Sequence, residues 1–147
     1  MPVDIQTIED TVITALKAGM PYLRYCDSYS GQLDEQSILM FVKNFPAVLV
    51  YLERSKYTNR GYPLKWRHIE FAIFVADKNS RGNKAARHGD LNNPGTYHML
   101  NDVLGVLQDK NLGLTGIDPF DVDREDAVIN SSKLALYGAI YKTKYST

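Results

Sequence analysis

The chain begins with apolar residues three and four positions apart, the spacing that places side chains on one side of an α-helix. The stripe consists of Ile5, Ile8, Val12 and Leu16. Asp4 can cap the first turn, and Gly19 followed by Pro21 can end the last one. We therefore expect an amphipathic helix of about four turns that covers a flat surface.

Apolar and polar positions alternate in the middle of the chain, a pattern typical of β-strands. Aromatic content predicts a strand over 22–29, and alternation predicts strands over 47–57 and 64–76. Between the latter two, residues 58–63 contain Asn59, Gly61 and Pro63, which favour chain reversal, so these strands should form one long antiparallel hairpin. Residues 33–43 fit either a short helical turn or an irregular edge.

The second half of the chain returns to helical spacing and then to alternation. A second amphipathic helix is expected after Thr96, its candidate N-cap, and should end near Gly113. Its apolar face would comprise Tyr97, Leu100, Val103, Leu104 and Leu107. Alternation then predicts strands at 120–124 and 133–145. The order of elements indicates one α+β domain over 1–147: a mostly antiparallel sheet with two amphipathic helices packed on one face, and a long basic loop.

Composition narrows the possible classes of protein. Among 147 residues, 17 Lys and Arg balance 17 Asp and Glu, which disfavours a dedicated DNA-binding protein because such proteins need a surplus of cations. The single cysteine, Cys26, excludes an intramolecular disulfide and fits a chain that folds in a reducing cytoplasm. No apolar run approaches the roughly 18 residues of a membrane span, and the first residues lack a signal-peptide pattern, so we expect a soluble protein without a membrane partner.

Candidate catalytic and metal-binding chemistry is sparse. The three histidines, His68, His88 and His98, are far apart, and the helical pair of His98 with Asp102 is too small a ligand set for zinc. Nucleophile-elbow, phosphate-loop and dinucleotide motifs are absent. We therefore expect no cofactor, no metal and no enzymatic activity. A remaining alternative is a metal-dependent nuclease. Its ligands would come from Asp118, Asp121, Asp123, Glu125 and Asp126, although an outward-facing strand explains their alternation better.

Residues 77–94 break every periodicity and exceed the roughly 12–15 residues at which a structureless loop becomes unusual. Four cationic residues recur every three positions in this segment, and a histidine follows the last of them: Lys78, Arg81, Lys84, Arg87 and His88. This spacing would gather them on one side of a short helical turn as a basic knob. Two interpretations stay open: a solvated, mobile loop, or an arm that docks on an acidic neighbour, most simply another copy of the chain.

Several stretches, in their order along the chain, carry a family resemblance. They are the helix opening Ile5-Gln6-Thr7-Ile8-Glu9-Asp10, the turn Tyr29-Ser30-Gly31-Gln32-Leu33, the strand 45–50, the stretch 79–89 and Gly95-Thr96-Tyr97. With them, the chain resembles the small tail terminator proteins of Mu-like contractile-tailed phages and prophages over nearly its whole length. It departs from the family pattern at Lys84, where an acidic residue is common, and at His88, where arginine is common.

This resemblance implies a ring, for which six subunits are expected, that caps the head-proximal end of a contractile tail. The ring would stop addition of tube and sheath and join the neck. Implied partners are further copies of the chain, the tail tube protein, the tail sheath protein and a neck or head-completion protein, with no membrane and no sequence-specific nucleic acid. Lys78, Arg81, Lys84, Arg87 and His88 would hold a neighbouring subunit, the tube or the sheath. The protein would reside in the virion tail or neck, after assembly in the host cytoplasm; a neck connector is the alternative.

Overall fold

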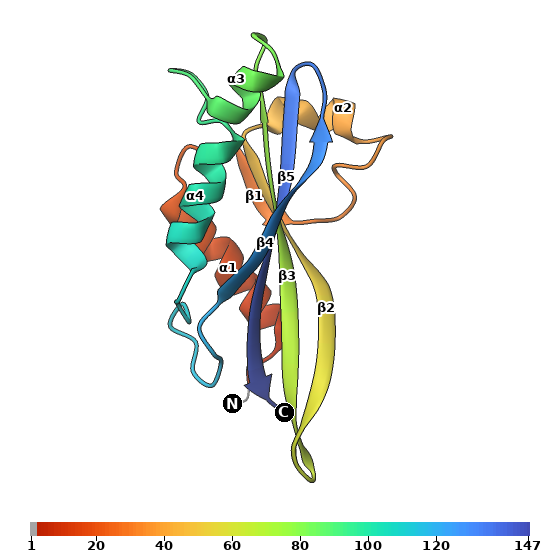
Figure 1. Ribbon diagram of the computed structural model, residues 1–147, viewed down its shortest axis with the longest axis vertical. Helices are drawn as coiled ribbons and strands as arrows, with labels where there is room; N and C mark the ends of the chain where they lie inside the picture. The colour runs from red at the N-terminus through yellow and green to blue at the C-terminus, as the bar shows by residue number, and fades with distance from the viewer. Residues whose placement is uncertain (1–2) are drawn as a thin grey trace.

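The structure is a computed structural model that describes residues 3–147 (Figure 1). The helices are α1 (Ile5–Gly19), α2 (Ile38–Phe41), the 3-10 turn η1 (Val42–Asn44), α3 (Asn83–His88) and α4 (Thr96–Leu107). The strands are β1 (Tyr25–Ser28), β2 (Ala47–Gly61), β3 (Leu64–Lys78), β4 (Asp121–Asn130) and β5 (Leu134–Ser146). They form one sheet in the order β1-β2-β3-β5-β4, in which only β1 and β2 are parallel. The expected α+β fold with a mostly antiparallel sheet is confirmed.

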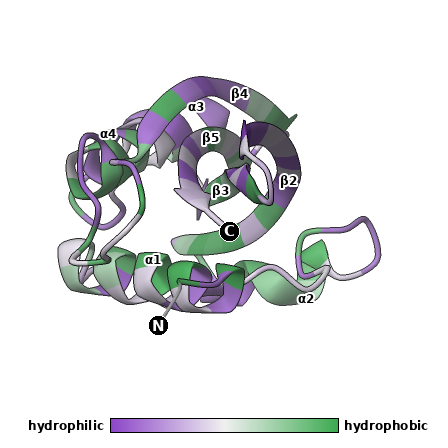
Figure 2. Cartoon of the chain, turned by 90° about the horizontal axis from the view of Figure 1, so that it is seen from below, coloured by the Kyte–Doolittle hydropathy of each residue, from purple (hydrophilic) through white to green (hydrophobic). Residues whose placement is uncertain are grey.

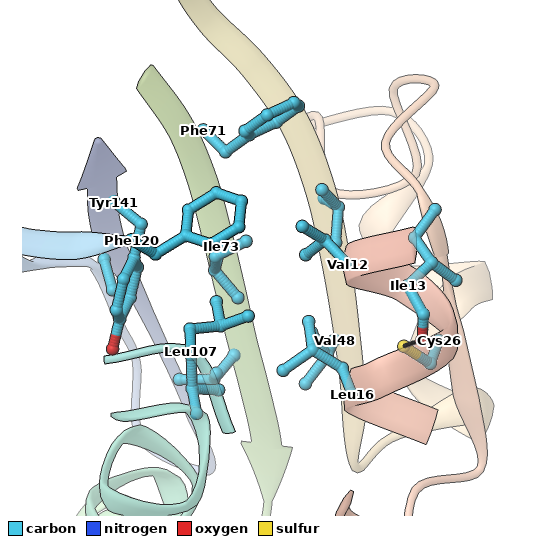
Figure 3. Close-up of a cluster of buried hydrophobic side chains, with 14 of the residues drawn as sticks. Val12, Ile13, Leu16, Cys26, Val48, Phe71, Ile73, Leu107, Phe120 and Tyr141 are labelled. Atoms are coloured by element: carbon cyan, nitrogen blue, oxygen red, sulfur yellow. Dashed lines mark hydrogen bonds between the residues drawn. The ribbon is translucent and has the colours of Figure 1, made fainter. Parts of the chain in front are cut away.

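Helix α1 forms where its apolar stripe predicts it. The Asp4 carboxylate accepts a hydrogen bond from the backbone N of Thr7 at 2.7 Å, which satisfies a donor left free at the helix start. Val12 and Leu16 point from α1 toward Val48 of the sheet (Figure 3) and are fully buried. Helix α4 packs beside α1 on the same face of the curled sheet (Figure 2), so the predicted placement of both helices is confirmed.

Among residues 3–147, those that cover the opposite face of the sheet lie near one end of it. There the segment between β1 and β2 folds back, and Leu33 and Phe45 pack against Leu49 and Leu136 in a second apolar cluster. This explains why both faces of β2 are buried over residues 47–50. At the other end, the β2–β3 hairpin projects from the body (Figure 1), and its β2 strand is exposed along most of its length.

Several predicted boundaries are wrong. Strand β1 begins at Tyr25 rather than at residue 22, because the Tyr22 hydroxyl donates to Asp102 of α4 at 2.6 Å and the chain turns before Tyr25. The hairpin strands continue through most of the expected turn, so that only Tyr62 and Pro63 connect them. Strand β4 runs to Asn130, well beyond the expected alternating segment.

The second helix also differs from its prediction. Gly95 is the N-cap and Thr96 is the first helical residue, with no side-chain capping bond. Helix α4 ends at Leu107, before Gly113. Its buried residues are Thr96, Met99, Leu100, Val103 and Leu107, whereas Tyr97 and Leu104 are exposed. The two stripes share Leu100, Val103 and Leu107. The observed stripe is rotated by roughly 50° around the helix axis, or about half a residue, toward Thr96 and Met99. No helix within the described residues is both long and apolar enough to cross a membrane.

Candidate interaction surfaces

Residues 77–94, named here the basic segment, are held at both ends by one carboxylate. Asp77 is fully buried at the end of β3, and its two oxygens accept hydrogen bonds from the backbone N atoms of Lys78 and Gly95, each at 2.8 Å. Burial raises the pKa of Asp77 above its ordinary value, against the opposing effect of these two hydrogen bonds. The start and end of the basic segment are therefore tied together.

A second set of hydrogen bonds lies next to this link. The Asn79 side chain donates to Asp90 at 2.7 Å and accepts from the backbone N of Arg81 at 3.0 Å. Asp90 also accepts from the backbone N atoms of Asn92 and Asn93. The hydrogen bond from Asn79 is the largest of the effects that lower the pKa of Asp90. These bonds fold the segment back on itself.

Two glycines permit the backbone of the basic segment to approach itself closely. Gly89 and Gly95 have φ angles of +80° and +81°. A Cβ atom on Gly89 would lie 2.2 Å from the carbonyl oxygen of Pro94, and one on Gly95 would lie 2.3 Å from the backbone N of Gly89. Only glycine combines this conformation with this contact at low cost.

The short helix α3 attaches the basic segment to the β4–β5 turn. The Asn83 side chain donates to the carbonyl oxygen of Leu134 at 2.8 Å and to Asn130 at 3.1 Å, and Ala86 is fully buried. A short helical turn is present inside the segment, as expected, but of the five predicted residues it contains only Lys84, Arg87 and His88; Lys78 ends β3 and Arg81 precedes α3. Since both its ends and its helix are hydrogen bonded to the body, the basic segment is a folded element rather than a featureless solvated loop.

The five predicted site residues divide into two groups. Arg87 donates to Asn83 at 2.7 Å and to the Tyr97 hydroxyl, and the His88 ring lies 5.4 Å from the Tyr97 ring. The hydrogen bond from Arg87 lowers the pKa of Tyr97. Arg87 and His88 therefore hold α3 against α4, so the five residues do not form one uniform knob.

The other three predicted residues can make contacts outside the chain. Arg81 and Lys84 are exposed, and Lys78 is half-buried at the end of β3. Within residues 3–147, the charged side-chain groups of these three residues and of Arg87 have no carboxylate oxygen within 4.0 Å. Leu39 and Met40 of α2, at the same end of the molecule as α3 (Figure 1), are 80% and 78% exposed. This end is therefore basic and partly apolar.

The projecting hairpin is a second basic surface, which the sequence analysis missed. Its residues 54–68 include five of the 17 Lys and Arg residues and none of the 17 Asp and Glu residues. The five are Arg54, Lys56, Arg60, Lys65 and Arg67. Since the whole chain is formally neutral, the remaining residues carry a formal charge of −5. This run of cations without a carboxylate was visible in the sequence.

Aromatic rings on the hairpin are already in contact with its cations. The guanidinium of Arg60 and the ammonium of Lys144 each lie 4.8 Å from the Trp66 ring, and the guanidinium of Arg67 lies 5.3 Å from the Tyr57 ring. Such cation–π contacts stabilise the hairpin and orient its charges.

The carboxylates proposed as nuclease ligands lie along and before β4, an exposed edge strand. Asp123 lies 3.2 Å from Lys142 and 3.0 Å from Arg124, and Lys142 lowers its pKa most. Asp126 pairs with Arg124 at 2.9 Å. Within the described part of the chain, no three His, Cys, Asp or Glu side chains are grouped closely enough to hold a metal ion. These carboxylates form an acidic edge rather than a cluster.

The remaining candidate residues have local partners. His98 lies 3.1 Å from Asp102, as the helical spacing predicts, and the His68 ring lies 2.8 Å from the Thr58 hydroxyl. Cys26 is buried beneath α1, and burial raises the pKa of its thiol to about 11. Cys26 thus packs as a small apolar side chain in the main cluster.

The fold and these surfaces describe a helix-covered, curled sheet with exposed charged edges and two dissimilar ends. The chain belongs to the family described as Bacteriophage Mu, Gp37, which matches residues 4–147. A comparison with curated proteins finds no match. Membership in this family identifies the protein as a phage structural or assembly protein.

Proposed function

We propose that this protein is a tail terminator: it forms a ring, expected to contain six subunits, on the head-proximal end of a contractile tail tube. The ring ends addition of tube and sheath subunits and offers a surface to the neck. The observation that carries the proposal is membership in the Bacteriophage Mu Gp37 family over residues 4–147. In this role the protein makes and breaks no covalent bond, needs no cofactor and has no membrane partner.

The two ends of the molecule support this role. Termination requires a ring with one face that fits the growing tube and another that rejects a further tube ring. One end of the subunit carries the hairpin tip, where Tyr62 is fully exposed, and the other carries α2 and α3 with Leu39 and Arg81 (Figure 1). Because these ends differ in shape and chemistry, a ring of parallel subunits has two different faces.

The basic segment supplies charged contacts in this proposal. Arg81 and Lys84, with Lys78 beside them, contact an acidic surface of a neighbouring subunit, the tube or the sheath. Arg87 and His88 contribute indirectly, since their contacts with Tyr97 hold α3 in place. Asp77 fixes the ends of the same segment.

Electron microscopy of tails from a strain with the gene disrupted tests the proposal. We expect over-long or ragged tubes without heads, restored to normal length by the wild-type gene. Complementation with Arg81→Glu plus Lys84→Glu should fail, because the acidic variant repels its partner surface. The control, Lys17→Glu plus Lys110→Glu, reverses the same number of charges at exposed positions elsewhere and should complement.

Two other outcomes would overturn this function. Tails of normal length that lack heads would move the protein to the neck, as a connector or head-completion component. Tails of normal length with heads attached would remove it from tail assembly altogether.

A further inference from the structure

The sheet has an open strand edge on each of its two sides. Strand β1 pairs with β2 only over residues 47–50, so the outer edge of β2 from Tyr51 to Gly61 has no partner strand within the described residues. On the other side of the sheet, the 10-residue strand β4 pairs with β5 alone. An open strand presents unpaired backbone N–H and C=O groups, and native proteins normally protect or use such edges.

The two open edges carry opposite charge. The free part of β2 includes Arg54, Lys56 and Arg60 against one carboxylate, Glu53. Strand β4 has four carboxylates, Asp121, Asp123, Glu125 and Asp126, against one arginine, Arg124. Each edge also exposes apolar side chains, with Tyr51 and Tyr57 about half exposed on β2 and Val128 52% exposed on β4. Charge and apolar area on one edge are thus complementary to those on the other.

The two edges are not paired with each other within one subunit, because β3 and β5 lie between them in the sheet. They can meet between two copies, when the β2 edge of one copy lies against the β4 edge of the next. This contact uses a different surface on each partner, so it repeats head to tail and closes into a ring when the rotation permits. Two copies of the same edge repel each other, since basic would face basic or acidic would face acidic.

The geometry points to one occupant for the hairpin edge: we propose that the basic edge of β2, residues 51–61, binds the acidic edge of β4, residues 121–130, of a neighbouring copy. This inference rests on the proposed ring and names its subunit contact. Both strands contain β-bulges, between Leu52 and Arg54 and between Val122 and Arg124 among others, which disfavour indiscriminate backbone pairing. Side-chain charge therefore selects the partner edge.

A nucleic-acid partner fits the hairpin less well. Proteins that bind single strands stack bases on free aromatic rings along a basic groove. Here a cation of the hairpin already lies over one face of the Trp66 ring and one face of the Tyr57 ring. Glu70 also lies 3.3 Å from Arg54. The chain as a whole is neutral, which matches a complementary protein edge better than a polyanion.

The test uses two charge-reversed variants of the whole protein. The hairpin variant carries Lys56→Glu and Arg60→Glu, and the edge variant carries Glu125→Lys and Asp126→Lys. We expect wild-type protein to form rings in sedimentation velocity and native mass spectrometry, and each variant alone to need about 100-fold higher concentration, because like charges then face each other. Circular dichroism checks that each variant is folded.

Mixing the two variants gives the decisive result. The acidic hairpin of the hairpin variant fits the basic β4 edge of the edge variant. The unchanged basic hairpin of the edge variant fits the unchanged acidic β4 edge of the hairpin variant. An equimolar mixture should therefore form rings that contain equal numbers of the two variants. The control pair, Lys17→Glu plus Arg24→Glu and Asp10→Lys plus Glu35→Lys, reverses exposed charges away from both edges and should form rings without mixing.

The possible failures are distinguishable. Rings formed normally by either variant alone would place the subunit contact elsewhere, and variants that both fail without rescue by mixing would show that the two edges do not touch. A hairpin variant that forms rings but loses binding to mixed-sequence duplex DNA would assign the hairpin to nucleic acid instead. Wild-type protein that stays monomeric, even with purified tail tubes, would refute the ring and with it the proposed function.

Discussion

The carboxylate of Asp77 should stabilise the fold through its two hydrogen bonds to the ends of the basic segment. In Asp77→Ala, the buried N–H of Gly95 loses its hydrogen-bond acceptor, which costs about 1–3 kcal/mol. The N–H of Lys78 also loses its acceptor, but Lys78 is partly exposed, so a water molecule can replace the carboxylate there. Part of this loss is offset because the substitution also removes the free-energy cost of burying a charged carboxylate. We expect the free energy of unfolding to fall by about 2 kcal/mol in urea titrations followed by Trp66 fluorescence.

Asp27 provides a matched control for this substitution. Its side chain accepts a backbone hydrogen bond from the next residue, Ser28, at 2.7 Å, like the bond from Lys78 to Asp77, but it is exposed and makes no long-range bond. Asp27→Ala should change stability by less than about 0.5 kcal/mol. Hydrogen exchange at the Gly95 amide should accelerate only in Asp77→Ala. An Asp77→Ala protein as stable as Asp27→Ala, with a protected Gly95 amide, would refute the argument.

The pH dependence of the same residue has a defined sign. Burial raises the pKa of Asp77 in the folded state, so the folded protein binds the proton more tightly than the unfolded chain does. As the pH falls through this raised pKa toward the ordinary value of an aspartate, the cost of the buried charge disappears. Wild-type stability should therefore rise relative to Asp77→Asn, which does not titrate. If the free energy of unfolding of wild type minus that of Asp77→Asn stays constant or decreases as the pH falls, burial is not the cause of the raised pKa.

Three further predictions concern buried groups and backbone strain. At pH 8 iodoacetamide should modify Cys26 about 100-fold more slowly in folded protein than in urea, because burial raises its pKa to about 11; equal rates would show an accessible thiol. Tyr141→Phe should cost nothing or raise the melting temperature, since the buried Tyr141 hydroxyl has no hydrogen-bond partner in the described residues. Gly89→Ala should destabilise the fold by about 1–3 kcal/mol in urea titrations, because its Cβ atom would collide with the backbone of Pro94. Gly113 also has a positive φ angle but has open space around it, so Gly113→Ala should cost less. Equal losses in the two variants would show that this collision does not contribute.

Much of the fold was predictable because local patterns and tertiary packing agree. The stripe at Ile8, Val12 and Leu16 has helical spacing and also faces the sheet, so propensity and burial select the same structure. The alternation from Ile69 to Val75 likewise places its apolar side chains in the main cluster. In such segments the side-chain period alone determines which face is buried.

Prediction failed where contacts distant in sequence decide the boundary. The stripe on α4 could begin at Thr96 or Tyr97, and packing against α1 and the sheet selects the rotation that buries Met99 and exposes Tyr97. The hairpin tip has polar residues on both faces, so periodicity gives no signal there, and pairing with β3 extends β2 to Gly61. Strand β4 extends to Asn130 for the same reason, since β5 provides its partner.

Periodicity and charge are properties of residues close together in the chain, so they were enough to predict the α+β class, the two amphipathic helices, the hairpin and the cations of residues 77–94. The contacts that those cations make depend instead on residues far apart in the chain. Asp77 and Gly95 meet although the whole basic segment separates them, and Arg87 turns inward to Tyr97 while Arg81 stays exposed. The two oppositely charged sheet edges likewise exist only after strand order is set, since no local pattern states which strands are left without a neighbour.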